Sequence, residues 1–158
     1  MGRVISLLGV MRKNLLLLIA LFLLHPTAHA CSCISQTGSE EEILRSAFSR
    51  APLVFIGTAV EQKSGFFDEY ERETVFNTEH IFKGQAAKPI KTNIWIGCCA
   101  CGFDFRIGER YLVFAYPHHE IEGTFSVNTC GLTSELNEKT LTQIELLHEI
   151  SGEVPDDA

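Results

Sequence analysis

Six cysteines constrain the fold of this chain more than any other feature of its 158 residues. They are Cys31 and Cys33 near the start, then Cys98, Cys99, Cys101 and Cys130. Residues two apart in an extended segment point to the same face, so Cys31 and Cys33 must each reach a distant partner. The cysteine spacing alone leaves the pairing open. Any acceptable fold must therefore bring the N-terminal segment close to the later cysteines.

Residues 1–30 have the pattern of a secretory signal peptide. Arg12 and Lys13 form a basic start, residues 15–24 contain no polar side chain, and residues 28–30 match an Ala-x-Ala cleavage site. We expect translation to begin at Met11, directly before the basic pair, and cleavage after Ala30 to leave Cys31 as the first residue. The apolar run is about half of the roughly 20 residues that a membrane span needs, so no stable span is expected after cleavage.

The signal carries three basic residues and no acidic ones, so its removal changes the formal net charge from −7 to −10. A surface this acidic repels phosphate backbones and anionic lipid headgroups. The composition therefore argues against a protein that binds nucleic acid or an anionic membrane.

Export predicts a secreted or periplasmic protein, whose cysteines lie in an oxidising compartment that favours disulfides. An alternative is bacterial lipoprotein processing, which alkylates the Cys31 thiol with lipid and acylates its amine. The flank disfavours this route, because Ala28-His29-Ala30 lacks the large aliphatic residue that lipoprotein signals carry three positions before the cysteine.

One helix is predicted after the N-terminal segment of the mature chain. Ser39 followed by Glu42 forms a capping box, and the acidic residues of the first turn favour the positive end of the helix dipole. The apolar side chains on one face are Ile43, Leu44, Ala47 and Phe48. Pro52 ends the helix.

After Pro52 the apolar period becomes that of strands, with five runs predicted at Leu53–Val60, Thr74–Phe82, Ile90–Ile96, Tyr111–Tyr116 and Thr124–Thr129. One helix and five short strands predict a mainly β domain, either a small barrel or a sandwich. Because Leu53–Val60 is apolar on both faces, it needs cover outside the barrel as well as inside it.

A second helix near Glu135–Ile150, with Leu141, Ile144 and Leu147 on one side, supplies part of that cover. Trp95 alternates with Ile94 and Ile96, and we expect it to serve in packing. The domain is predicted to span residues 31–151, followed by a flexible tail at residues 152–158.

The chain resembles a bacterial-type secreted member of the tissue inhibitors of metalloproteinases (TIMPs). The matching residues are Cys31-Ser32-Cys33, Ala47-Phe48 with Leu53–Gly57, Ile81–Gly84, Cys101-Gly102-Phe103 and Thr129-Cys130. Their order and rough spacing agree along residues 31–133. The resemblance implies a netrin-like module with an OB-fold barrel, a helix on each side of the strands in sequence, and disulfides Cys31–Cys101 and Cys33–Cys130.

The resemblance also implies a function. TIMPs place the α-amine and carbonyl oxygen of their first cysteine on the catalytic zinc of a protease, and their second side chain enters the adjoining specificity pocket. Here Cys31, Ser32 and Cys33 would form that wedge. The expected partner is a zinc metalloprotease, and the chain itself would be neither an enzyme nor the holder of a cofactor. The competing hypothesis is a periplasmic or surface netrin-like binding module whose disulfides are purely structural.

Some features depart from the family or stay open. A cysteine that the family carries aligns near Ser49, whereas Cys98 and Cys99 are extra. These two cysteines could pair with each other or with another chain, remain thiols, or form a zinc site with His118 and His119. Phe66, Phe67 and Tyr70 follow the first strand and either contact a target or cover the mouth of the barrel.

Overall fold

The computed structural model describes residues 33, 37–64, 71–95 and 101–152. The elements are α2 (Glu40–Arg50), β1 (Leu53–Ser64), β2 (Glu71–Lys83), β3 (Ile90–Trp95), β4 (Arg110–Pro117), β5 (Phe125–Ser126), β6 (Ser134–Glu135) and α3 (Glu138–Ser151). Within the described residues no helix is long and apolar enough to cross a membrane.

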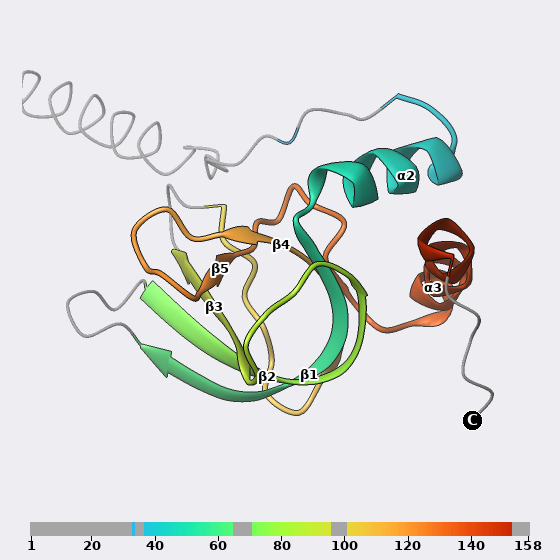
Figure 1. Ribbon diagram of the computed structural model, residues 1–158. Helices are drawn as coiled ribbons and strands as arrows, with labels where there is room; N and C mark the ends of the chain where they lie inside the picture. The colour runs from blue at the N-terminus through green and yellow to red at the C-terminus, as the bar shows by residue number, and fades with distance from the viewer. Residues whose placement is uncertain (1–32, 34–36, 65–70, 96–100, 153–158) are drawn as a thin grey trace, which may run out of the picture.

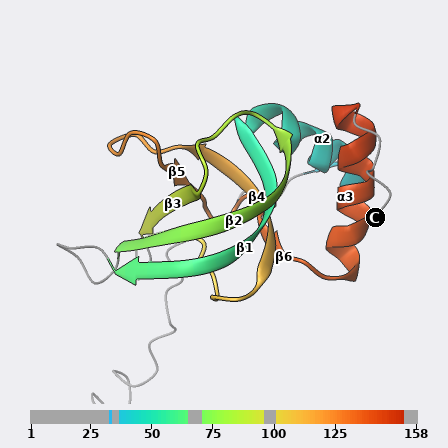
Figure 2. The same ribbon diagram turned by 60° about the horizontal axis from the view of Figure 1, so that its bottom comes forward.

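The strands close into a barrel in the order β1-β2-β3-β5-β4, with β4 pairing back onto β1. The β3–β5 pair is parallel, through Thr92 and Phe125, and the other pairs are antiparallel. The two-residue strand β6 adds to β4. Figure 1 shows the barrel with α2 and α3 beside it, and the turned view in Figure 2 shows both helices on the same side. The fold is thus a closed five-stranded barrel of the OB type, as predicted.

Strand β1 carries the two-layer core. Leu53, Phe55 and Ala59 point into the barrel, where they join a cluster that includes Phe76 and Ile90. The alternate residues Val54 and Ile56 point outward against the helices, in a second cluster that includes Leu44 of α2 and Leu147 of α3. The predicted need for cover on both faces of this strand is confirmed.

Helix α2 is defined at both ends by groups that the sequence supplies. Ser39 and Glu42 form the predicted capping box, and the helix ends at Arg50, just before Pro52. The Nζ of Lys83 donates to the carbonyl oxygens of Phe48 and Ser49, at 2.7 and 2.9 Å. A cation at this end favours the negative pole of the helix. Lys83 thereby ties α2 to the end of β2.

Helix α3 begins later than predicted and presents a different face. Asn137 and Thr140 form its capping box. Thr140 and Leu147 are buried, and Ile144 packs against the outer cluster. The prediction that Leu141 shares this face is wrong, because Leu141 is 53% exposed. The helix packs along the side that carries Thr140 and Leu147, which leaves Leu141 on the solvent side.

Two other predictions need correction. The fifth predicted strand, Thr124–Thr129, contains only the short β5, with an isolated bridge between Asn128 and Gly102 beyond it. Trp95 is not packed in the core but 52% exposed, while its neighbour Ile94 is buried. Alternation along β3 directs Ile94 into the barrel and Trp95 outward.

An ion pair that joins three strands gives stability that depends on pH. Glu79 of β2 accepts hydrogen bonds from the Nε of Arg110 on β4, at 3.1 Å to each oxygen, and from Oγ1 of Thr58 on β1, at 3.0 Å. Chiefly the hydrogen bonds from Arg110 hold the pKa of Glu79 below its ordinary value, although partial desolvation opposes them. A lowered carboxylate pKa stabilises the fold above the pKa of an unfolded glutamate, and this contribution disappears as the pH falls through the folded value.

We expect Glu79→Gln to lower the free energy of unfolding at pH 7 by less than about 1 kcal/mol, because the pair is accessible to water. The difference from the wild type should shrink as the pH falls below about 4. Urea unfolding at pH 7 and pH 3 measures both values, with Glu145→Gln on the exposed face of α3 as the control. A deficit in Glu79→Gln that persists at pH 3 would contradict the assignment.

Candidate functional site

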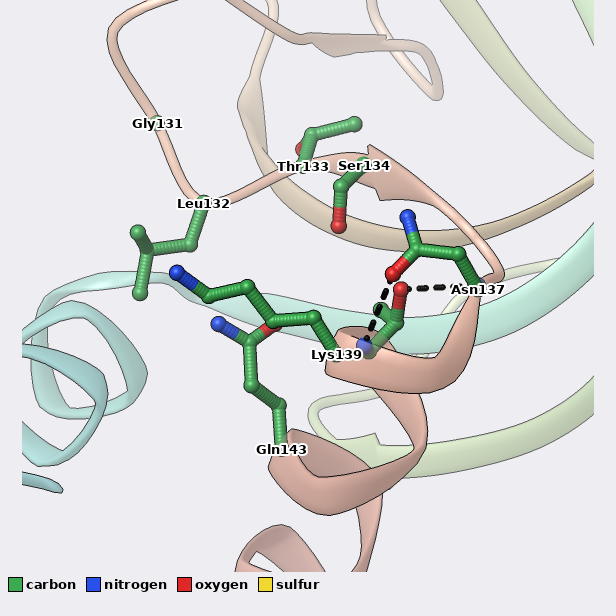
Figure 3. Close-up of a pocket in the computed structure, with 8 residues that line it drawn as sticks. Gly131, Leu132, Thr133, Ser134, Asn137, Lys139 and Gln143 are labelled. Carbon is green, nitrogen blue, oxygen red and sulfur yellow. Dashed lines mark hydrogen bonds between the residues drawn. The ribbon is translucent and has the colours of Figure 1, made fainter. Parts of the chain in front are cut away.

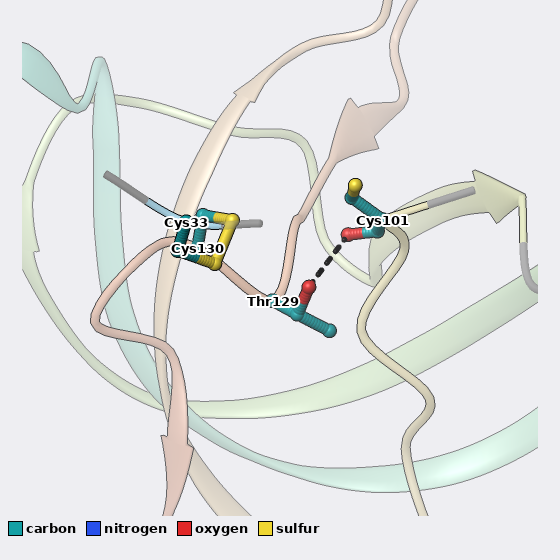
Figure 4. The surroundings of a disulfide bond; sticks show 4 residues. All are labelled: Cys33, Cys101, Thr129 and Cys130. Atoms are coloured by element: carbon teal, nitrogen blue, oxygen red, sulfur yellow. Dashed lines mark hydrogen bonds between the residues drawn. A yellow bond between two sulfur atoms is a disulfide. The ribbon is translucent and has the colours of Figure 1, made fainter. Parts of the chain in front are cut away.

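A disulfide joins Cys33 to Cys130, across a sequence separation of 97, with their Cα atoms 5.2 Å apart. This pairing confirms the one that the resemblance implied. Cys130 lies in the segment between β5 and β6, so the bridge attaches the start of the described chain to that segment (Figure 4).

Cys101 lies beside this bridge. Its carbonyl oxygen accepts from the backbone N–H of Thr129 at 2.8 Å and from the Thr129 hydroxyl at 3.3 Å, as the dashed line in Figure 4 indicates. Cys101 is itself disulfide-bonded. Its predicted partner, Cys31, lies outside the described residues. Cys33, Cys101, Thr129 and Cys130 are referred to below as the cystine cluster.

The next residue, Gly102, explains how the segment after Cys101 fits against the barrel. The Gly102 N–H donates to the carbonyl of Trp95 at 3.1 Å, and the Phe103 N–H donates to the carbonyl of Val127 at 3.3 Å. A Cβ at position 102 would lie 2.1 Å from the Trp95 oxygen. Only glycine permits this approach of two backbones, and it places Cys101 between the end of β3 and the segment that carries Cys130.

Aromatic packing in the barrel core also holds the segment that follows Cys101. Phe103 and Phe105 have ring centroids 4.8 Å apart, and Phe105 meets Tyr111 edge-on at 4.9 Å and Phe76 at 4.8 Å. Phe105 and Tyr111 are 2% exposed. The Cys-Gly-Phe sequence is therefore anchored by backbone pairing on one side and by the core on the other, so the cystine cluster stands on a rigid base.

The remaining predicted site residues fall into two groups. Cys31, Ser32, Phe66, Phe67, Tyr70, Cys98 and Cys99 lie outside the described residues. His118 and His119 are described, and their rings stack with centroids 5.0 Å apart.

The two histidines have local roles in the turn after β4. The Nδ1 atom of His118 accepts from the backbone N–H groups of Glu120 and Ile121, at 3.2 and 3.1 Å, so it organises the turn. His119 is exposed and lies 3.5 Å from the Glu120 carboxylate. In the part of the chain that the structure describes, no three His, Cys, Asp or Glu side chains form a group that could hold a metal ion.

A pocket of about 200 Å³ lies between the segment before α3 and the start of that helix. Figure 3 shows the side chains that line it. Three of its polar side chains have partners within the fold. Asn137 and Thr140 bond to each other across the capping box, and Lys139 pairs with Glu40 of α2 at 3.0 Å. We assign this pocket a structural role in docking α3.

Sequence reasoning missed two features beside the cystine cluster. The first is the demand for glycine at position 102, which depends on a backbone contact from β3. The second is the exposed Trp95 at the end of that strand, opposite Glu71 of β2. Strand alternation could have placed Trp95 outside the barrel, because its neighbour Ile94 reads as a core residue.

A scan against models of protein families gives no match, and a search of curated proteins likewise finds no significant relative. The fold and the cystine cluster define a protein with a disulfide-linked barrel of the OB type, whose N-terminal segment is covalently attached to the barrel.

Proposed function

We propose that this chain is a secreted, TIMP-like inhibitor of a zinc metalloprotease that acts through Cys31. The observation that supports the proposal most strongly is the Cys33–Cys130 disulfide, which fixes the chain two residues after the proposed zinc ligands. The barrel of the OB type and the neighbouring disulfide-bonded Cys101 also agree with the proposal.

The chemistry requires a free N-terminal residue. A catalytic zinc keeps one coordination position open for water, and the α-amine and carbonyl oxygen of Cys31 together provide a bidentate N,O ligand for it. The Ser32 side chain would enter the adjoining pocket of the protease. An α-amine has an ordinary pKa near 8 and binds metal only when it has lost its proton, so inhibition should weaken in acid.

In this proposal the barrel contributes to inhibition by restraining the N-terminal segment. A flexible N-terminus would lose conformational entropy on entering a protease cleft, whereas a segment attached at Cys33 has less conformational freedom to lose. In the proposal a second bridge, Cys31–Cys101, attaches the zinc-binding residue itself.

The proposal also requires export and cleavage after Ala30, which create the amine. A secreted or periplasmic location supplies the oxidising conditions that both bridges need. Intact-mass and N-terminal analysis of the exported protein tests this step. A mature chain that starts elsewhere, or that carries a lipid or acyl group on Cys31, excludes the mechanism.

Adding one alanine before Cys31 should abolish inhibition, because the amine then lies one residue away from the zinc. The measurement is residual activity across a panel of purified zinc metalloproteases, with thermal unfolding in parallel. The matched control adds one alanine after Ala158 and should inhibit as well as the unmodified protein. We expect the melting temperature to be nearly equal in all three proteins, since the added residue lies outside the barrel.

Two outcomes would favour the competing hypothesis of a netrin-like binding module with structural disulfides. One is inhibition that survives the N-terminal alanine, and the other is a mature protein with a free Cys31 amine that inhibits no protease in the panel. A bridge with a sequence separation of 97 stabilises the fold whether or not the protein inhibits a protease. This observation favours the second hypothesis.

A further inference from the structure

The outer face of the barrel carries an aromatic and carboxylate pair where β2 begins and β3 ends. Glu71 and Trp95 are directly opposite each other in the antiparallel β2–β3 ladder. Side chains of directly opposed residues lie on the same face, with Cβ atoms roughly 5 Å apart. Trp95 is 52% exposed, so its ring is accessible beside the carboxylate.

Asn93 completes this group from two residues earlier on β3, on the same face of the sheet. Its Nδ2 donates to Oε1 of Glu71 at 2.7 Å, which fixes the carboxylate next to the tryptophan. Asn93 is only 5% exposed, and its Oδ1 is buried without a donor in the described chain. Buried polar atoms are normally hydrogen-bonded, so this oxygen is an unsatisfied acceptor beneath the pair.

The charge of Glu71 is also unbalanced. The other glutamates on this face have cationic partners: Glu61 pairs with Lys63 at 3.0 Å, and Glu73 pairs with Lys91 at 3.6 Å. Glu71 has no ion pair within the described residues. Its only side-chain bond there is to the neutral amide of Asn93. Within the described residues, the patch of Glu71, Asn93 and Trp95 therefore combines a negative charge without an ion pair, an exposed π face and a buried acceptor without a donor.

We propose that this patch binds the guanidinium group of an arginine on a protein partner. A guanidinium stacks on an indole ring and donates from its edge to a carboxylate at the same time, which an ammonium group does less well. The acidic net charge of the chain, −7, favours a basic ligand at long range.

The position of the patch connects it to the proposed inhibition, and the identity of the partner rests on that proposed function. The carbonyl of Trp95 accepts from Gly102, the residue after Cys101. A protease held at the cystine cluster would therefore present its surface close to Trp95. In this arrangement the patch selects proteases that carry an arginine beside the cleft.

The chain contains a single tryptophan, so its fluorescence reports directly on the patch. The experiment titrates the mature protein with N-acetyl-arginine amide and, as the uncharged isostere, N-acetyl-citrulline amide. We expect a saturable change in emission with the arginine probe, weaker at high salt, and a much smaller one with the citrulline probe. Equal responses to the two probes, or no saturable response to arginine, would overturn the proposal.

Two variants test the role of the carboxylate. Glu71→Gln keeps the hydrogen bond from Asn93 and removes the charge, and should weaken binding of the arginine probe by about fivefold or more, since charge-assisted bonds are the stronger ones. Glu61→Gln, on the same face but already paired with Lys63, should bind as the wild type does. Equal affinities in the wild type and Glu71→Gln, with both proteins folded by thermal unfolding, would contradict the assignment.

The titration needs no protease, which separates this inference from the proposed function. The protein extended by one alanine before Cys31 should bind the arginine probe unchanged even though it no longer inhibits. One outcome would support the arginine-binding patch and overturn only the metalloprotease proposal. In that outcome Glu71→Gln loses arginine binding, while neither the wild type nor any variant inhibits a protease.

Discussion

Replacing Cys130 with serine should lower the free energy of unfolding by about 3–5 kcal/mol, the largest effect that we expect from a single substitution. The Cys33–Cys130 bridge has a sequence separation of 97, so its removal greatly enlarges the unfolded ensemble. For a domain of this size the change corresponds to a drop in melting temperature of roughly 10–20 °C. Urea unfolding and a thermal scan, both without reductant, measure it.

The double variant with Cys33→Ser and Cys130→Ser is the control for this prediction. Either single change already removes the bridge, so the double variant should be nearly as stable as each single one. It also removes the unpaired thiol that a single variant would carry. A double variant as stable as the wild type would show that the bridge contributes little to the fold.

The same double variant separates stability from the proposed inhibition. Without the bridge, the N-terminal segment loses its attachment two residues after Cys31. If inhibition depends on an ordered wedge, the double variant should inhibit less well even at temperatures where its barrel is fully folded. Equal inhibition would indicate that the attachment at Cys33 is purely structural.

The features of the fold that the sequence predicted correctly are those set by neighbouring residues. The capping box of Ser39 and Glu42 and the stop before Pro52 depend on contacts within a few positions, and both occur as expected. The two apolar faces of β1 predicted cover on both sides, which the barrel core and the helices provide. Local chemistry and strand alternation were sufficient for these elements.

The errors lie where tertiary packing decides. The spacing of α3 predicted that Leu141 lies on the buried side with Ile144 and Leu147, but the helix buries Thr140 and Leu147 and leaves Leu141 exposed. Thr124–Thr129 looked like a full strand, yet only Phe125 and Ser126 pair as one, because the chain leaves the sheet to meet Gly102. Neither outcome can be derived from period or propensity alone.

The candidate site shows the same division. Spacing alone left the cysteine pairing open, and only the family resemblance selected Cys33–Cys130, which the structure confirms. Nothing local marks Gly102 as indispensable, because the atom that excludes a side chain there belongs to Trp95, on a different segment. The unsatisfied Oδ1 of Asn93 is likewise a product of burial.

Gly102→Ala should be the second most damaging substitution, with a loss of about 3 kcal/mol or more in the free energy of unfolding. The added Cβ would lie 2.1 Å from the carbonyl oxygen and 2.9 Å from the carbonyl carbon of Trp95, both backbone atoms that cannot turn aside. The segment would have to move outward and lose the hydrogen bond from Gly102 to Trp95, and with it the pairing of Cys101 with Thr129.

Gly131→Ala provides the matched control, one residue after Cys130. A Cβ at Gly131 meets its nearest atom, the Asn128 carbonyl oxygen, at 3.4 Å, an ordinary contact. We expect this change to alter stability by no more than about 0.5 kcal/mol. Urea unfolding of the two variants side by side compares their losses in the free energy of unfolding. The substitutions are chemically identical and differ only in the atoms that the new methyl group contacts. Equal losses would show that the close approach of Gly102 to Trp95 does not hold the cystine cluster in place.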